Sequence, residues 1–203
     1  LHDFTFRDPS EVLSELTGET GIAMDHSKMG HAPKPATAAG GAVSAPVAPA
    51  PIMQHGAHGG AMDLNDVTYD AFLANDRTLA DPHVVRIEDG ARVRLRIINA
   101  ASSTNFTIDT GRVQASAIAV DGNPIVPVIG RQFPLAVAQR LDLLLSLPRE
   151  IRVCPILARQ EGTAAQTGII LAKRGGYVRR LGVANRTIAP AVNLAFEKRL
   201  AAT

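Results

Sequence analysis

Alternation of polar and apolar residues is the main pattern along most of the chain, and it predicts β-strands. The clearest run spans residues 92–98, in which three arginines alternate with apolar residues. Because successive side chains of a strand point to opposite faces, one face of this strand should meet solvent and the other a core. Similar runs are found at 2–6, 67–73, 84–87, 106–109, 115–120, 124–129, 132–137, 141–147, 152–157 and 168–171.

Turn residues separate these runs at intervals of about 8–12 residues. Asp89-Gly90 and Asp121-Gly122 are the strongest turn pairs. The runs at 124–129 and 132–137 contain proline and should lie at sheet edges, because proline cannot donate to a strand ladder. No long helical pattern intervenes, which argues against a parallel α/β sheet. The pattern therefore predicts an all-β sandwich or barrel.

One short helix is predicted near the beginning of the chain. Asp8 suits the N-cap, Pro9 suits the first helical position, and Glu11 completes a capping box. Gly18 suits the end of the helix. The apolar face of this helix would consist of Val12, Leu13 and Leu16.

Residues 19–62 have a different composition, in which Ala, Gly and Pro dominate. Such a segment buries too little apolar surface to offset the entropy lost on ordering, so a long disordered insertion is predicted. The chain is therefore divided into a first strand with a short helix (1–18), a flexible His/Met-rich insertion (19–62), a β-sandwich (63–172) and a basic linker (173–203).

The insertion contains the residues with the clearest chemistry. All four methionines and four of the six histidines of the chain lie between residues 24 and 62. Thioethers are soft ligands suited to Cu(I), and imidazole suits Cu(II), so a flexible chain can wrap these donors around one ion. The alternative is a low-complexity insertion that a surface loop tolerates. The candidate metal ligands are Met24, His26, Met29, His31, Met53, His55, His58 and Met62.

Charge and hydropathy argue against two classes of partner. From residue 173 onward, seven basic residues and one acid give this tail a charge of +6; since the whole chain carries +2, the remainder carries −4. A short basic tail with one Tyr and one Phe is a weak nucleic-acid signal, so no nucleic acid is expected as a partner. No run approaches the roughly 18 apolar residues of a membrane-spanning helix, so no membrane partner is expected.

Cys154 is the single cysteine of the chain, which excludes an internal disulfide and a cysteine-rich zinc site. It lies in a predicted strand, and we interpret it as a small buried hydrophobe. Asp142 and Arg140 lie on one face of another predicted strand and suit an ion pair. A catalytic carboxylate would need a partner acid that the sequence does not supply nearby.

Several runs together resemble the middle domain of bacterial multicopper oxidases of the laccase-like type. They are FLAN (72–75), VRIEDGARVRLRIINA (85–100), AVDGNP (119–124) and AQRLD (138–142), and their order and spacing carry the resemblance. The opening LHDFTF (1–6) looks like the first strand of that domain, so the resemblance covers about residues 1–175. It implies a cupredoxin-like Greek-key β-sandwich, flanked by further cupredoxin domains of the same parent protein.

The resemblance also implies where the parent protein holds its copper. Members of the family oxidise substrates one electron at a time and reduce dioxygen to water. Their type 1 copper ligands come from the third domain, and their trinuclear cluster uses His-X-His pairs of the first and third domains. This chain has no His-X-His, and Cys154 is followed by Pro155 with no histidine within ten residues. No catalytic or cofactor-binding residue is assigned, and the chain alone is expected to be inactive as an oxidase.

Three hypotheses for the function remain open at this point. In the first, the chain is the structural middle domain of a multicopper oxidase, its tail leads to the third domain, and copper binds here only transiently through the insertion. In the second, it is a stand-alone copper-binding or metal-resistance module. In the third, it is a non-enzymatic interaction sandwich. The start lacks an initiator Met and a signal peptide, so we interpret the chain as a piece of a longer protein, and the family implies the periplasm.

Overall fold

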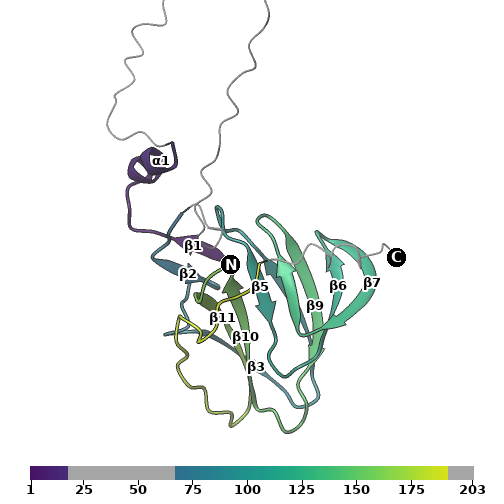
Figure 1. Cartoon of the computed structure of the whole chain (residues 1–203). Helices are drawn as coiled ribbons and strands as arrows, with labels where there is room; N and C mark the ends of the chain where they lie inside the picture. Colours follow the sequence, from purple (N-terminus) through teal and green to yellow (C-terminus); the bar gives the residue numbers. More distant parts are fainter. Residues whose placement is uncertain (18–66, 192–203) are drawn as a thin grey trace, which may run out of the picture.

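The fold is a sandwich of two β-sheets, with one short helix outside it (Figure 1). The computed structural model describes residues 1–17 and 67–191. The two packed sheets confirm the all-β, cupredoxin-like sandwich expected from the sequence.

In chain order the elements are β1 (His2–Phe4), α1 (Pro9–Thr17), β2 (Ala71–Leu73), β3 (His83–Ile87), β4 (Arg92–Ile98), β5 (Phe106–Asp109), β6 (Ala115–Val120), β7 (Asn123–Gly130), β8 (Gln132–Leu135), β9 (Arg140–Ser146), β10 (Val153–Gln160) and β11 (Gln166–Lys173).

The two main sheets differ in the number of their strands. The first has five strands in the order β3-β11-β10-β5-β8, and the second has four in the order β4-β9-β6-β7. All the strand pairs are antiparallel except β3 with β11, which run parallel. A small antiparallel pair, β1 with β2, lies at one end of the sandwich (Figure 1).

The core lies between the two sheets and is aliphatic with a few aromatic rings. Alternation places the inward side chains, as along β9, where Leu141, Leu143 and Leu145 are buried. The rings of Phe72 and Phe106 meet edge to face with centroids 5.8 Å apart. Further core residues are Ile108, Val113, Ala115, Ala117, Ile125, Val128, Phe133, Leu135, Cys154, Ile156, Ala158 and Leu171.

Proline marks the edges of both sheets, as the sequence predicts. β7, which contains Pro124 and Pro127, is the edge of the four-stranded sheet, and β8, which contains Pro134, is the edge of the five-stranded sheet. Pro155 lies in β10, an inner strand, but β5 pairs with β10 only from Leu157 onward. The missing N–H of Pro155 therefore leaves no gap in that ladder.

The two predicted turn pairs have different roles. Asp121-Gly122 closes the β6–β7 hairpin, and both residues have positive φ, at 49° and 84°. These angles are typical of a two-residue type I′ turn, which favours Asn or Asp followed by Gly. Asp89-Gly90 also forms a turn, with φ of 75° at Gly90, but β3 and β4 on either side belong to different sheets. The chain therefore crosses from one sheet to the other at this turn.

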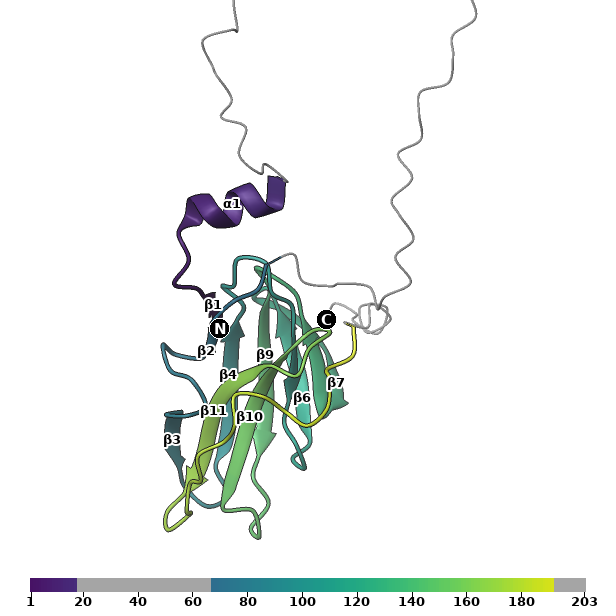
Figure 2. The same ribbon diagram turned by 60° about the vertical axis from the view of Figure 1, so that its left-hand side comes forward.

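The predicted helix is confirmed as α1, and Asp8 is its N-cap. The Asp8 carboxylate accepts a hydrogen bond from the Ser10 backbone N–H at 2.8 Å. Bonds from the Ser10 hydroxyl and backbone N–H lower the pKa of Asp8. No residue of α1 is buried, and the helix stands away from the sandwich (Figure 2).

Residues 174–191 return along the β10–β11 hairpin after β11 ends (Figure 2). The Gln166 N–H donates to the Val183 carbonyl at 2.8 Å, and the Ala189 N–H donates to the Thr163 carbonyl at 2.7 Å. Ala189 is buried, at 1% exposure. This part of the basic tail is therefore packed against the sandwich.

Candidate functional site

The predicted copper ligands are the eight methionines and histidines of the insertion. All of them lie between residues 18 and 66, outside the described residues. They are Met24, His26, Met29, His31, Met53, His55, His58 and Met62.

The two histidines that the structure does describe lie near β2. His2 Nε2 is 3.6 Å from the Asp76 carboxylate, and His83 Nδ1 is 2.8 Å from the Asn75 side-chain amide. Within residues 1–17 and 67–191, no group of three or more His, Cys, Asp or Glu side chains could hold a metal ion. A blue-copper centre needs a thiolate and imidazoles that converge. The described residues therefore do not fit a catalytic copper centre.

Cys154 is a buried core residue, which confirms its interpretation as a small hydrophobe. It is 3% exposed, and its Sγ lies 3.7 Å from the Thr110 carbonyl oxygen. Burial, together with the smaller effect of the nearby charge of Asp109, raises the pKa of the thiol to about 11. A cysteine must lose its proton to bind a metal, so this thiol is poorly suited to copper at neutral pH.

We expect the Cys154 thiol to react with a disulfide reagent at pH 8 at least about 100-fold more slowly in the folded chain than in urea.

The free energy of unfolding should also fall as the pH rises. The unfolded thiol ionises near its ordinary pKa of 9.0 and the folded thiol only near 11, so the unfolded state is favoured progressively between these values. Urea unfolding of the natural chain and Cys154→Ala from pH 8 to 11 measures this difference. Equal pH slopes for the two proteins would contradict a buried, protonated thiol.

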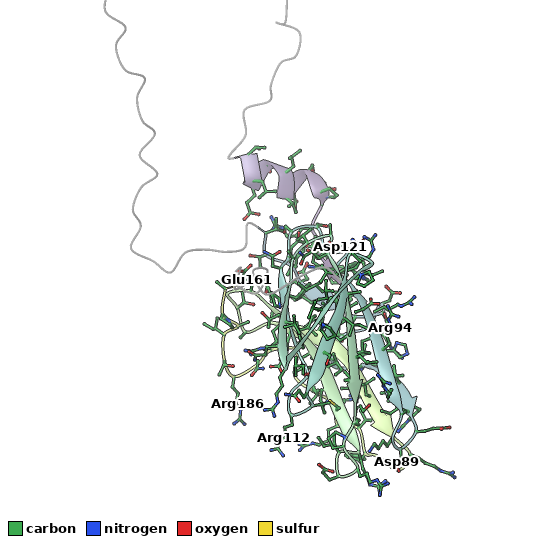
Figure 3. All side chains as sticks on the ribbon, turned by 90° about the vertical axis from the view of Figure 1, so that its right-hand side faces the viewer. Asp89, Arg94, Arg112, Asp121, Glu161 and Arg186 are labelled. Atoms are coloured by element: carbon green, nitrogen blue, oxygen red, sulfur yellow. The ribbon has the colours of Figure 1, made fainter. Side chains whose placement is uncertain are left out.

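Asp142 of β9 forms an ion pair, but with a different partner from the one expected. Its Oδ2 accepts a hydrogen bond from Arg94 Nε at 2.8 Å and lies 3.8 Å from Arg96 Nε. Both arginines project from the outer face of β4, and Figure 3 labels Arg94 there. The predicted partner, Arg140, instead donates its backbone N–H to the Asp121 carboxylate at 2.8 Å. Arg96 lies directly opposite Asp142 in the β4–β9 register and Arg94 is its diagonal neighbour, and long side chains reach across both separations.

The described chain exposes two groups of apolar side chains, besides Tyr177, Val183 and Ile188 of the segment after β11. The first surrounds β1 and α1, where Phe6, Leu13 and Leu16 are 85%, 60% and 51% exposed. The second is on β7, where Val126 and Ile129 are at least half exposed. Exposed apolar side chains that gather on one element are typical of surfaces that contact other proteins or domains.

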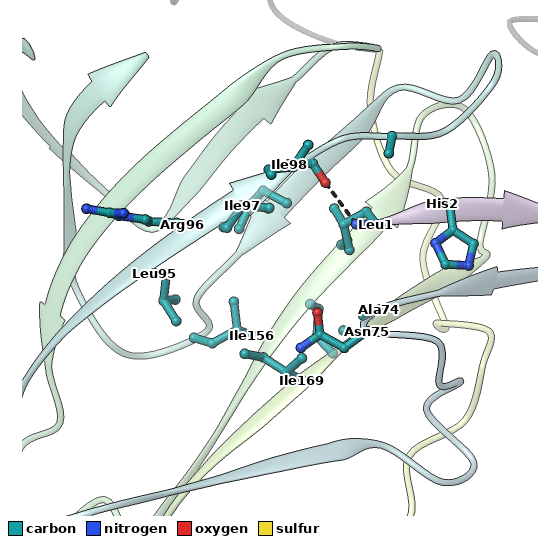
Figure 4. Close-up of a pocket in the computed structure, with 15 residues that line it drawn as sticks. Leu1, His2, Ala74, Asn75, Leu95, Arg96, Ile97, Ile98, Ile156 and Ile169 are labelled. Atoms are coloured by element: carbon teal, nitrogen blue, oxygen red, sulfur yellow. Dashed lines mark hydrogen bonds between the residues drawn. The ribbon is translucent and has the colours of Figure 1, made fainter. Parts of the chain in front are cut away.

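A cavity of about 350 Å³ opens between the two sheets beside β4 (Figure 4). Leu95 and Ile97 of β4 form one wall, and Ile156 and Ile169 of the other sheet face them across it. Leu1 closes one end. The cavity is also lined by His2, Ala74, Asn75, Arg96, Ile98, Ala100, Ile108, Leu157, Ala158 and Gly168.

Comparison with known proteins identifies the family. The sequence model of the multicopper oxidases matches residues 35–173, which is more than half of the chain. The chain belongs to the multicopper oxidase family. The multicopper oxidase MmcO of Mycobacterium tuberculosis is 28% identical to it over 114 residues, which is 56% of this chain. This multicopper oxidase chain spans only 22% of the length of that relative.

Solved multicopper oxidases also resemble the sandwich. The blue copper oxidase from Nitrosomonas europaea is 18% identical, with a TM-score of 0.47, over 61% of this chain and 41% of the other. The laccase from Botrytis aclada is 21% identical, with a TM-score of 0.43, over 52% of this chain and 21% of the other. None of the described helices is long and apolar enough to cross a membrane.

Proposed function

We propose that the chain is the structural middle domain of a multicopper oxidase. The observation that carries this proposal is the state of Cys154. The single cysteine of the chain is buried in the core with a raised pKa, so it is not available as the thiolate of a type 1 copper centre. In the parent enzyme, other domains would hold the copper that couples oxidation of a substrate to reduction of dioxygen.

The surface supports a role as a spacer between flanking cupredoxin domains. The apolar regions around α1 and on β7 lie on different sides of the sandwich (Figure 1). A domain that packs against two neighbours needs two such surfaces, and isolated domains seldom expose them. The parent protein is proposed to be periplasmic.

The second part of the proposal concerns the His/Met-rich insertion. Its four methionines and four histidines supply soft thioether donors for Cu(I) and imidazole donors for Cu(II). These donors would capture copper transiently and pass it to, or buffer it for, the copper centres of the parent enzyme. No catalytic step is assigned to them.

A copper titration, with metal quantified and the visible spectrum recorded, tests both parts. We expect bound copper without the intense blue band of a copper thiolate, and no consumption of dioxygen with a reducing substrate. Replacing the four methionines by Leu and the four histidines by Gln should weaken Cu(I) binding at least about tenfold, because the donors are removed. A control with His2→Gln and His83→Gln should bind copper as the natural chain does.

Two outcomes would contradict the two parts separately. A blue band that disappears in Cys154→Ser would show a type 1 centre in this chain, and the proposal of a structural domain would fail. Undiminished Cu(I) affinity after loss of all eight donors would show that the insertion does not capture copper, and would leave the structural role untouched.

A further inference from the structure

An open groove lies where β3 and β11 end, and we call it the β3–β11 groove. The two strands are parallel neighbours, and their register pairs Ile87 with Lys173, so they end side by side (Figure 2). The volume of the groove, about 640 Å³, is within the range typical of small-molecule sites. Its lining shares no residue with that of the cavity beside β4. The lining residues are Arg86, Ile87 and Glu88 from the end of β3, and Arg174, Gly175, Gly176 and Tyr177 from the turn after β11.

Two guanidinium groups of the β3–β11 groove have no counter-charge. Within residues 1–17 and 67–191, neither Arg86 nor Arg174 forms an ion pair, and both residues are exposed. Asp89, in the turn after β3, is neutralised by Lys173, whose ammonium group lies 2.9 Å from its carboxylate. Glu88 supplies one negative charge to the lining, so two arginines and one glutamate give it a net charge of +1.

Hydrogen bonds and close packing fix the turn that carries Arg174. The Gly176 N–H donates to the Lys173 carbonyl at 3.0 Å, and the Arg152 guanidinium donates to the Arg174 carbonyl at 3.2 Å. A Cβ on Gly176 would lie 2.8 Å from the Arg152 carbonyl oxygen, so the turn packs directly against the residue that precedes β10. A turn that is already ordered loses little conformational entropy when a ligand binds to it.

Tyr177 adds an apolar surface beside these guanidinium groups. It is 83% exposed, and Ile87, which also lines the groove, is half-buried. An exposed tyrosine ring provides a rigid face on which a planar group can stack. A guanidinium group binds a carboxylate through two parallel hydrogen bonds. The groove therefore combines a positive anchor with a planar apolar surface.

We propose that the β3–β11 groove is a binding site for a monoanionic aromatic carboxylate. The carboxylate would accept hydrogen bonds from Arg86 and Arg174, and the ring would pack on Tyr177 and Ile87. Inorganic phosphate should bind more weakly, because it lacks the ring and because Glu88 would repel its second charge. The proposal concerns this groove alone, and it rests neither on copper binding nor on the place of the chain in a larger protein.

Titration of the full chain with sodium benzoate, followed by backbone amide NMR and by calorimetry, tests the proposal. We expect saturable shifts that are largest at the amides of Gly175, Gly176 and Tyr177. Benzamide, which has the same ring without the charge, should produce no saturable shift at these amides. Inorganic phosphate should bind more weakly than benzoate.

Three variants separate the anchor from the ring. Arg86→Gln combined with Arg174→Gln should weaken benzoate binding at least about tenfold, because charge-assisted hydrogen bonds are lost. Arg112→Gln combined with Arg131→Gln removes the same charge from two exposed arginines elsewhere, and this control should bind benzoate as the natural chain does. Tyr177→Ala should weaken benzoate binding about three- to tenfold and leave the binding of acetate unchanged.

Four results would overturn the proposal. No saturable shift with benzoate, or shifts that are largest away from the turn after β11, would show that the groove is not its site. An equal loss of affinity in the two double variants would show attraction by net charge alone. Phosphate that binds more tightly than benzoate would show a site for simple oxyanions, and equal binding of benzamide would show that the arginines do not anchor the ligand. The comparisons among benzoate, benzamide and phosphate use the natural chain, so they decide the matter whatever the stability of the variants.

Discussion

Gly168→Ala is expected to destabilise the fold by at least about 3 kcal/mol, and thereby to leave much of the protein unfolded or insoluble. Gly168 lies in β11 with φ of +151°, a backbone conformation that residues with a side chain rarely adopt. A Cβ at this position would lie 3.0 Å from Leu157 Cα and closer still to the Ile156 carbonyl oxygen. Both are backbone atoms of the neighbouring strand, so neither can move aside without breaking the β10–β11 ladder.

Urea unfolding followed by circular dichroism measures the effect of Gly168→Ala. Gly111→Ala is the matched control, because Gly111 also has positive φ, at +62°, but its added Cβ would meet no atom within 4 Å. That control isolates the backbone strain and should cost only about 1 kcal/mol. Equal stability of the two variants would contradict the close approach of the β10 backbone to Gly168.

Residue alternation predicted most strands of the sandwich, because the alternation of a strand depends on its own residues. The strands β4, β5 and β6 begin and end at the predicted residues, and the prolines of β7 and β8 lie on edges as expected. Alternation reports which side chains face a core, and proline reports which strands lack a neighbour. Neither signal states which strands share a sheet, so the crossing from β3 to β4 at Asp89-Gly90 was not predictable.

Long-range contacts shortened two of the predicted strands. The runs 2–6 and 67–73 were both expected to be strands, but only His2–Phe4 and Ala71–Leu73 pair with each other. The Asp70 carboxylate accepts hydrogen bonds at 2.8 Å from the Phe6 N–H and the Thr5 hydroxyl. These bonds replace the ladder at that end, and they join residues more than sixty positions apart. A local pattern carries no information about such a partner.

The candidate copper ligands were identified from residue types alone. The thioether and imidazole donors of residues 24–62 were recognised from composition alone, and they lie outside the described residues. The burial of Cys154 followed from its place in an apolar strand. The place of β4 at the edge of the four-stranded sheet, as far as the chain is described, could not be foreseen, because an edge is defined by the strands beside it and not by its own residues.

Lys173 is the first of the basic residues near the end of the chain, and it is also the last residue of β11. Its side chain is 1% exposed. Its ammonium group lies 2.9 Å from the Asp89 carboxylate and donates to the Pro148 carbonyl at 2.7 Å. It therefore ties β11 to the β3–β4 turn, where Figure 3 labels Asp89, and to the loop after β9.

We expect Lys173→Ala to cost about 2–4 kcal/mol, because it removes a buried aliphatic stem together with the charged group that satisfies two acceptors. Lys173→Met keeps most of the stem and should cost only about 1 kcal/mol.

The hydrogen bond and charge of Lys173 lower the pKa of Asp89. Their contribution to stability is therefore present above the ordinary pKa of 3.8 and is lost as the pH falls below it. Urea unfolding at pH 7, and between pH 5 and 3, should therefore show a shallower acid dependence in Lys173→Met than in the natural chain. Equal costs for the two variants would mean that the stem contributes nothing, and an unchanged acid dependence would mean that Asp89 and Lys173 do not interact in solution.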